Sequence, residues 1–147
     1  MSLRCFSNIS ISRINEVTDF VGPLIRKGSV IGLTGGLGAG KTYLTSCIFS
    51  KLGIEEQIVS PTFTIMNQYY LPAIDCAFYH FEVYRINGAS DLDAIGFFDA
   101  ISETDSVIVV EWAEKIREVL PEKNCLFIEI KYAAENAENR DYSIFIC

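Results

Sequence analysis

An octapeptide at residues 35–42, Gly-Gly-Leu-Gly-Ala-Gly-Lys-Thr, constrains the fold of this chain more than any other feature. It fits the pattern G-x-x-x-x-G-K-[ST], in which small residues leave room for backbone N–H groups to surround phosphate oxygens. Lys41 brings a positive charge to the β- and γ-phosphates, and the Thr42 hydroxyl is a ligand for Mg²⁺. The predicted phosphate loop consists of Gly35, Gly36, Leu37, Gly38, Ala39, Gly40, Lys41 and Thr42.

The segments on either side fit the strand–loop–helix arrangement that such a loop requires. Residues 30–34, Val-Ile-Gly-Leu-Thr, form a short apolar stretch typical of a buried parallel strand. After the loop, Leu44, Ile48 and Leu52 recur at helical spacing, and Gly53 is a suitable helix end. We therefore predict that the chain binds a nucleoside triphosphate; the alternative is a glycine-rich loop without a ligand.

The remaining pattern indicates one α/β domain over residues 1–147. Half of the residues are hydrophobic, and a chain of this length is able to bury a sizeable core. One helix is expected after Ser12, its predicted N-cap, with Pro23 interrupting it, and another over residues 113–120. Strands are expected at residues 3–9, 30–34, 77–86, 107–111, 126–132 and 142–146, the last two as a hairpin. These elements predict a P-loop NTPase-like fold with a central mixed, partly parallel sheet flanked by helices.

Composition restricts the setting in which the chain works. No apolar run approaches the about 18 residues that span a bilayer, and residues 1–8 lack the apolar core of a signal peptide. We therefore expect a cytoplasmic protein that does not bind a membrane. The net charge is −7, with 12 Lys and Arg against 19 Asp and Glu. This balance disfavours direct binding to nucleic acid and favours docking on a basic protein partner.

Glu111 is the first candidate for the acidic residue that a phosphate loop needs to hold Mg²⁺. It directly follows the apolar residues 107–110, so its carboxylate is expected at the carboxyl edge of the sheet, where ligands bind. We predict that Thr42 and Glu111 hold the metal; the alternative is a strand-end glutamate that only meets water.

Glu82 is the second acidic candidate. It alternates with His80 and Tyr84, so all three are expected on one face of a strand. The pattern leaves open whether this face is catalytic or solvated. The candidate catalytic residues are thus Lys41, Glu111 and, where this face is catalytic, Glu82.

The segment Ser60-Pro61-Thr62-Phe63 lies between the loop helix and the next strand. In nucleotide-binding switch proteins, the loop at this point of the chain carries hydroxyl groups that contact the γ-phosphate and Mg²⁺. We predict this role for Ser60 and Thr62; the alternative is a proline-fixed entry into a strand. Trp112 adjoins Glu111 and is expected to report on the bound nucleotide.

Taken together, these pieces resemble the TsaE family (formerly YjeE), the small ATPase of bacterial tRNA threonylcarbamoyladenosine biosynthesis. The resemblance covers nearly the whole chain. It rests on Gly35-Gly-Leu-Gly-Ala-Gly-Lys-Thr42, Leu52-Gly-Ile54, Ser60-Pro-Thr-Phe-Thr64, His80-Phe-Glu-Val-Tyr-Arg85, Ile95-Gly96 and Glu111-Trp-Ala-Glu114.

The resemblance implies an ATPase that works in the cytoplasm with the TsaD and TsaB proteins. Those partners attach a threonylcarbamoyl group to adenosine 37 of tRNA, so the chain would meet tRNA only indirectly, through the complex. The resemblance assigns Mg²⁺ to Thr42 and Glu111 and places Glu82 near the metal and the γ-phosphate. Two positions depart from the family pattern, because Gly36 and Glu82 each stand where the family has aspartate.

Three other functions remain as alternatives. A small kinase needs a lid and several arginines to clamp a second phosphorylated substrate, and the chain has six arginines and no basic lid segment. A GTPase is disfavoured because Asp93-Ala-Ile-Gly96 follows no predicted strand and no Asn-Lys-x-Asp motif occurs. A nucleotide-gated binding module without hydrolysis would carry the same residues. Arg140 and the region near Ser12 are candidates for flanking the base.

Overall fold

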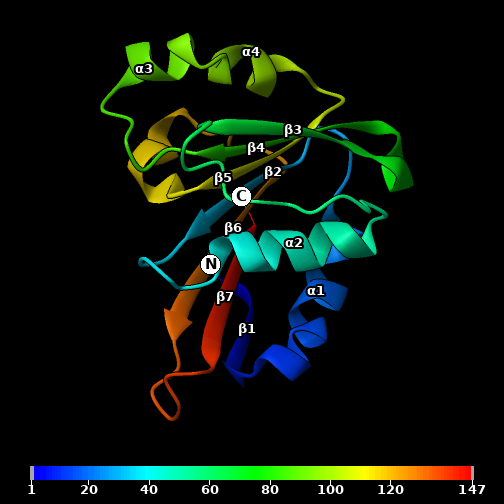
Figure 1. Ribbon diagram of the computed structural model, residues 1–147, viewed down its shortest axis with the longest axis vertical. Helices are drawn as coiled ribbons and strands as arrows, with labels where there is room; N and C mark the ends of the chain where they lie inside the picture. Colours follow the sequence, from blue (N-terminus) through cyan, green and yellow to red (C-terminus); the bar gives the residue numbers. More distant parts are fainter. Residues whose placement is uncertain (1, 147) are drawn as a thin grey trace.

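The computed structural model describes residues 2–146, whose strands form a mixed sheet in the order β1-β7-β6-β2-β5-β4-β3 (Figure 1). The strands are β1 (Ser2–Ile9), β2 (Val30–Thr34), β3 (Met66–Leu71), β4 (Cys76–Glu82), β5 (Val107–Glu111), β6 (Cys125–Tyr132) and β7 (Arg140–Ile146). β6, β2, β5 and β4 run parallel in the centre, whereas β3, β7 and β1 add antiparallel edges. The predicted mixed, partly parallel α/β sheet is confirmed.

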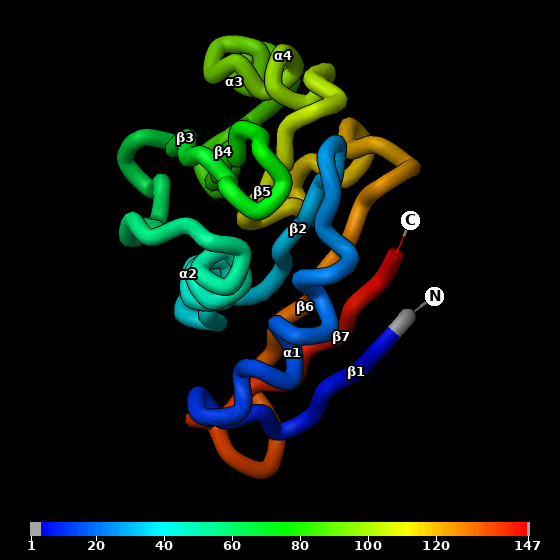
Figure 2. The backbone as a smooth tube through the Cα atoms, turned by 90° about the vertical axis from the view of Figure 1, so that its right-hand side faces the viewer, coloured from blue at the N-terminus to red at the C-terminus, as the bar shows by residue number. Residues whose placement is uncertain are grey.

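Helical segments cover both faces of this sheet (Figures 1 and 2). They are α1 (Asn15–Val21), α2 (Lys41–Lys51), α3 (Ala89–Ala94), α4 (Phe97–Ser102) and the 3-10 segments η1 (Ile11–Arg13), η2 (Gly22–Leu24), η3 (Pro72–Ile74) and η4 (Ala113–Val119). One buried cluster joins α1 and α2 to the sheet, and a second joins α3, α4 and η4 to the opposite face. Within residues 2–146, no helix is both long and apolar enough to cross a membrane.

Two of the predicted helices differ from those observed. Ser12 is not an N-cap, because it lies inside η1 and its hydroxyl bonds to that of Ser10, and α1 begins only at Asn15. Pro23 interrupts the helix as predicted, since it lies in the 3-10 turn after α1. Residues 113–119 form 3-10 turns rather than an α-helix, because the backbone at Ile116 leaves helical geometry.

The strand predicted at residues 77–86 also ends earlier, at Glu82. The next residue, Val83, still donates its backbone N–H to the Glu111 carbonyl, and a turn then follows. Tyr84 therefore lies beyond the strand, and its ring packs against Trp112 with the centroids 4.8 Å apart.

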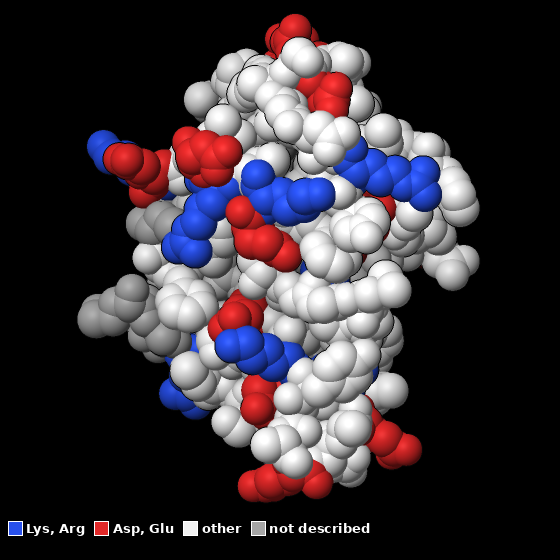
Figure 3. Space-filling model, turned by 90° about the vertical axis from the view of Figure 1, so that its left-hand side faces the viewer, with Lys and Arg blue, Asp and Glu red and all other residues white. Residues whose placement is uncertain are grey.

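The face of the molecule that Figure 3 displays carries charges of both signs. Lys and Arg side chains there lie intermingled with Asp and Glu side chains. Together with the net charge of −7, this mixed face lacks the dense positive charge on which binding to nucleic acid phosphates depends.

A stacked aromatic pair attaches α2 to the sheet. Phe49 of α2 and Phe78 of β4 are both fully buried, and their rings lie 4.0 Å apart and nearly parallel. Tyr69 of β3 stacks on Phe78 from the neighbouring strand at 5.4 Å. Because α2 begins with the last two residues of the phosphate loop, this packing also fixes the position of the loop.

We expect Phe78→Ala to lower the free energy of unfolding by about 3–5 kcal/mol, since it removes a buried ring and leaves a cavity under α2. Urea denaturation followed by circular dichroism measures this change. Phe63→Ala is the matched control, because Phe63 is 90% exposed and its loss should cost less than about 0.5 kcal/mol. Equal effects of the two substitutions would contradict the packing described here.

Candidate nucleotide-binding site

The register of the central strands brings the predicted acidic residues to one edge of the sheet. Glu111, the last residue of β5, pairs with Leu33 of β2 on one side and with Glu82 of β4 on the other. Since β2, β4 and β5 are parallel, both carboxylates lie at the edge from which the phosphate loop leaves β2.

A cavity of about 270 Å³ opens at this edge. The structure brings most of the predicted site residues together around it, from the loop, the switch segment and both strand ends. Its lining comprises Leu37, Gly38, Gly40, Lys41, Thr42, Tyr43, Ser60, Thr62, Glu82, Glu111 and Trp112. Of the predicted loop residues, Gly35, Gly36 and Ala39 are not part of this lining.

Gly35 shows why the loop needs a residue without a side chain. Its φ angle is +153°, and a Cβ atom there would lie 2.7 Å from the Ile130 carbonyl oxygen and 3.0 Å from the Ala39 Cβ. At Gly36, by contrast, a Cβ atom would meet no atom within 4 Å. The loop therefore packs tightly against β6 at its first glycine and is open at its second.

Lys41 holds its ammonium group over the loop rather than in bulk solvent. The Nζ atom donates to the carbonyl oxygens of Gly35 at 2.7 Å and Gly36 at 3.0 Å, and it lies 4.0 Å from the centroid of the Trp112 ring. Burial lowers the pKa of Lys41, while the carboxylates of Glu111, Glu114 and Glu82 oppose that shift. The carbonyl dipoles and the ring face thus compensate a largely buried positive charge.

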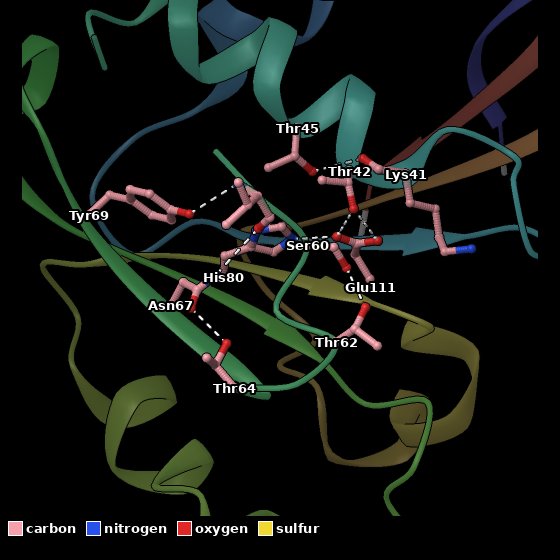
Figure 4. A network of polar contacts seen from close by, with 11 residues as sticks. Lys41, Thr42, Thr45, Ser60, Thr62, Thr64, Asn67, Tyr69, His80 and Glu111 are labelled. Atoms are coloured by element: carbon pink, nitrogen blue, oxygen red, sulfur yellow. Dashed lines mark hydrogen bonds and ion pairs between the residues drawn. The ribbon is translucent and has the colours of Figure 1, made fainter. Parts of the chain in front are cut away.

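Glu111 is buried, with 3% of its surface exposed, and it is held by two hydrogen-bond donors (Figure 4). Thr42 Oγ1 donates to its carboxylate oxygens at 3.0 and 2.8 Å, and His80 Nε2 lies 2.5 Å from its Oε2. His80 is fully buried, and among the described residues its Nδ1 has no hydrogen-bond partner. One carboxylate therefore joins the start of α2 to β4 and β5.

The donor set at this point fits Mg²⁺. A threonine hydroxyl and a glutamate carboxylate are hard oxygen ligands, which Mg²⁺ prefers, and it completes its shell with water and substrate phosphates. Thr42 and Glu111 already lie within 3.0 Å of each other beside the phosphate loop. Glu82 is half-buried on the neighbouring strand and lines the same cavity.

The segment at residues 60–63, predicted to act as a switch, borders the same cavity through Ser60 and Thr62. The Ser60 and Thr62 hydroxyls lie 2.7 Å apart, and Figure 4 shows their loop beside Thr42 and Glu111. Trp112 adopts a left-handed backbone conformation, with φ +63°, which turns the chain directly after Glu111.

Sequence reasoning missed the role of His80. The pattern left open a solvated strand face, whereas His80 is completely buried and contacts Glu111. A signal was present, because His80 alternates with the core residue Phe78 and with Glu82 at the strand end. Such a histidine points into the protein rather than toward water.

Arg140 was a candidate for flanking the base. It lines a second cavity of about 190 Å³, which shares Gly40 and Tyr43 with the first, together with Ser10, Ile11 and Ile14. Ser12 does not line this cavity. The residues of the Ser12 region that line this cavity therefore come from either side of Ser12, and their role beside a base stays a prediction.

Known proteins share the sequence pattern and the fold of this chain. The family model described as "Threonylcarbamoyl adenosine biosynthesis protein TsaE" matches residues 10–142. The chain belongs to the TsaE family. This finding confirms the resemblance inferred from the sequence motifs, and it assigns the chain to a family of tRNA threonylcarbamoyladenosine biosynthesis.

Individual TsaE relatives support the assignment over most of the chain. The tRNA threonylcarbamoyladenosine biosynthesis protein TsaE of Treponema pallidum is 40% identical over 102 residues, which cover 69% of this chain and 73% of the relative. The protein of the same name from Nostoc is 33% identical over 131 residues, covering 86% and 77%. The crystal structure of YdiB from Bacillus subtilis superposes with a TM-score of 0.72 at 30% identity, covering 96% of this chain and 83% of that one.

We expect Gly35→Ala to destabilise this TsaE-family chain by about 1–3 kcal/mol, because the added methyl group meets backbone and side-chain atoms that are tightly packed. Gly36→Ala is the matched control and should change the free energy of unfolding by less than about 0.5 kcal/mol. Thermal and urea denaturation of the two variants measure the difference. A Gly36 variant that is the less stable of the pair would show that the loop packs in another way.

Proposed function

We propose that this chain is a slow, Mg²⁺-dependent ATPase that supports threonylcarbamoylation of tRNA in the cytoplasm together with TsaD and TsaB. The observation that carries the proposal is the contact between the Thr42 hydroxyl and the Glu111 carboxylate, 2.8 Å apart beside the phosphate loop. That pairing of a loop threonine with a strand-end acid is what nucleoside triphosphate hydrolysis requires. Membership of the TsaE family supports the biological role.

Each residue at the cavity has a defined task in this proposal. The loop N–H groups and Lys41 bind and orient the β- and γ-phosphates, with Lys41 leaving its carbonyl partners for phosphate oxygens. Thr42 and Glu111 would hold Mg²⁺, whose charge would offset that of the phosphate oxygens. His80 keeps the Glu111 carboxylate directed at Thr42.

Glu82 is the residue best placed to orient the attacking water. It stands beside Glu111 across the β4–β5 pair and lines the cavity with a half-buried carboxylate. Among the described residues that line this cavity there is no arginine. Phosphoryl transfer gains much of its rate from such a charge, so slow hydrolysis by the isolated chain and stimulation by a partner are expected.

A nucleotide-gated binding module is the second candidate function. It is favoured by the contact series that runs from the loop to the surface: Lys41 lies over Trp112, Trp112 packs on Tyr84, and Lys115 lies over Tyr84. Phosphates that draw Lys41 away from Trp112 would change the packing below the exposed Tyr84 ring. Nucleotide binding without measurable turnover, with or without partners, would select this function.

We expect Lys41→Ala and Glu111→Gln each to lower ATP turnover by about a hundredfold or more, because charge stabilisation of the reacting phosphate is worth several kcal/mol. Release of inorganic phosphate from Mg-ATP measures the rates. Glu114→Gln is the matched control, since it removes the same charge from an exposed neighbour that does not touch Thr42. Unchanged turnover in the Lys41 variant would end the ATPase proposal.

We expect the TsaD–TsaB assembly to accelerate ATP hydrolysis by the wild-type chain, by up to about 10³–10⁵-fold if the partner supplies an arginine to the reacting phosphate. Because the chain carries a net charge of −7, the stimulation should weaken as salt rises from about 0.05 to 0.5 M. Phosphate release is measured with and without the assembly at both salt concentrations. Full activity of the isolated chain, or stimulation indifferent to salt, would contradict this docking.

A further inference from the structure

Arg140, the first residue of β7, directs its side-chain donors to backbone carbonyls, and two of these carbonyls belong to the phosphate loop. Its Nε donates to the Ala39 carbonyl at 2.9 Å, and its Nη2 donates to the Gly38 carbonyl at 3.2 Å. Its Nη1 donates to the carbonyls of Ala137 and Asn139 at 2.9 and 3.0 Å. One guanidinium thus ties two loop carbonyls to the turn between β6 and β7.

The donors of Arg140 are nearly exhausted by these contacts. A guanidinium has five N–H donors, and four of them are used. One face of the group is also covered, because it lies 4.0 Å from the centroid of the Tyr132 ring. Little hydrogen-bonding capacity is left for a nucleobase.

The two loop contacts also fix the direction of backbone N–H groups. In a planar trans peptide, the C=O and N–H of one unit point in opposite directions. Holding the Ala39 carbonyl toward Arg140 therefore turns the Gly40 N–H away from Arg140. Gly38 and Gly40 line the 270 Å³ cavity, and Arg140 does not; Arg140 lines the neighbouring 190 Å³ cavity, to which Gly40 also belongs.

The turn between β6 and β7, to which Arg140 bonds, is hydrogen-bonded in turn to β1. Asn8, at the bulge where β1 shifts its pairing with β7, accepts from Asn139 Nδ2 at 2.8 Å and donates to Glu135 at 2.9 Å. The Asn8 backbone N–H also donates to Asp141 at 2.7 Å. These bonds hold both sides of the β6–β7 turn against β1.

We propose that Arg140 is a positioning residue that holds the phosphate loop in its binding conformation and does not select the base. The proposal rests on the proposed function, because it concerns the loop that would bind ATP. Its consequence is that loss of Arg140 weakens the binding of every triphosphate by the same factor. A base-reading residue would instead affect only nucleotides with the base that it recognises.

The test measures the affinity of the wild-type chain and of Arg140→Ala for Mg-ATP, Mg-GTP and inorganic triphosphate by calorimetry. We expect all three to weaken by about tenfold, since hydrogen bonds from a charged donor no longer pre-organise the loop. At saturating ATP, kcat should stay within about threefold while KM rises, because the substitution weakens binding of the ground state and of the transition state equally. Arg117→Ala is the matched control: its guanidinium lies over the Phe127 ring at 4.5 Å, and Arg117 lines neither of the two cavities beside the loop.

Arg140→Lys provides a second variant that keeps the charge and most of the side chain. One ammonium cannot bridge the loop carbonyls and the turn, so we expect a loss of about threefold or more, again equal for the three ligands. An unchanged triphosphate affinity in both Arg140 variants, or a loss confined to ATP, would overturn the proposal. Failure of the wild-type chain to bind any of the three would instead refute the proposed function and this inference with it.

Discussion

A buried carboxylate at the end of β5 organises this molecule. Removing a charge from water is costly unless hydrogen-bond donors compensate for it, and Glu111 has such donors in Thr42 and His80. The three residues come from a helix and two strands, so their contact fixes α2 relative to the sheet. The His80 ring is fully buried, and its Nε2 contact orients the carboxylate.

The parts of the fold and of the site that are encoded locally could be predicted from the sequence. The loop at residues 35–42, the buried strand ending at Glu111 and the hairpin of β6 and β7 each follow from a short pattern of spacing and polarity. The exact start of a helix and the type of a helical turn could not be predicted, because they depend on which of several competing contacts forms. Ser12 bonds to Ser10 instead of capping a helix, and residues 113–119 tighten into 3-10 turns around Ile116.

The contact between His80 and Glu111 joins residues far apart in the chain, and the sequence pattern did not predict it. The polarity of His80 suggests an exposed strand face, whereas the ring is buried; the sheet register pairs His80 with Val109, and its Nε2 contacts the Glu111 carboxylate. The register also sets Glu82 and Glu111 side by side. Gly36 lies at an exposed part of the loop with room for a side chain, so the packing of the loop does not depend on which small residue stands there.

The pairing of β1 with β7 sets an order of events during synthesis of the chain. Residues 2–9 are synthesised well before their hydrogen-bonding partners in residues 140–146, which lie beside them in the fold (Figure 2). Contacts of such wide sequence separation form late, because closing the intervening chain costs entropy before any pairing is gained. The turn that carries Arg140 belongs to the same late-forming edge, so a nascent chain has its glycine loop long before it has the support of that loop.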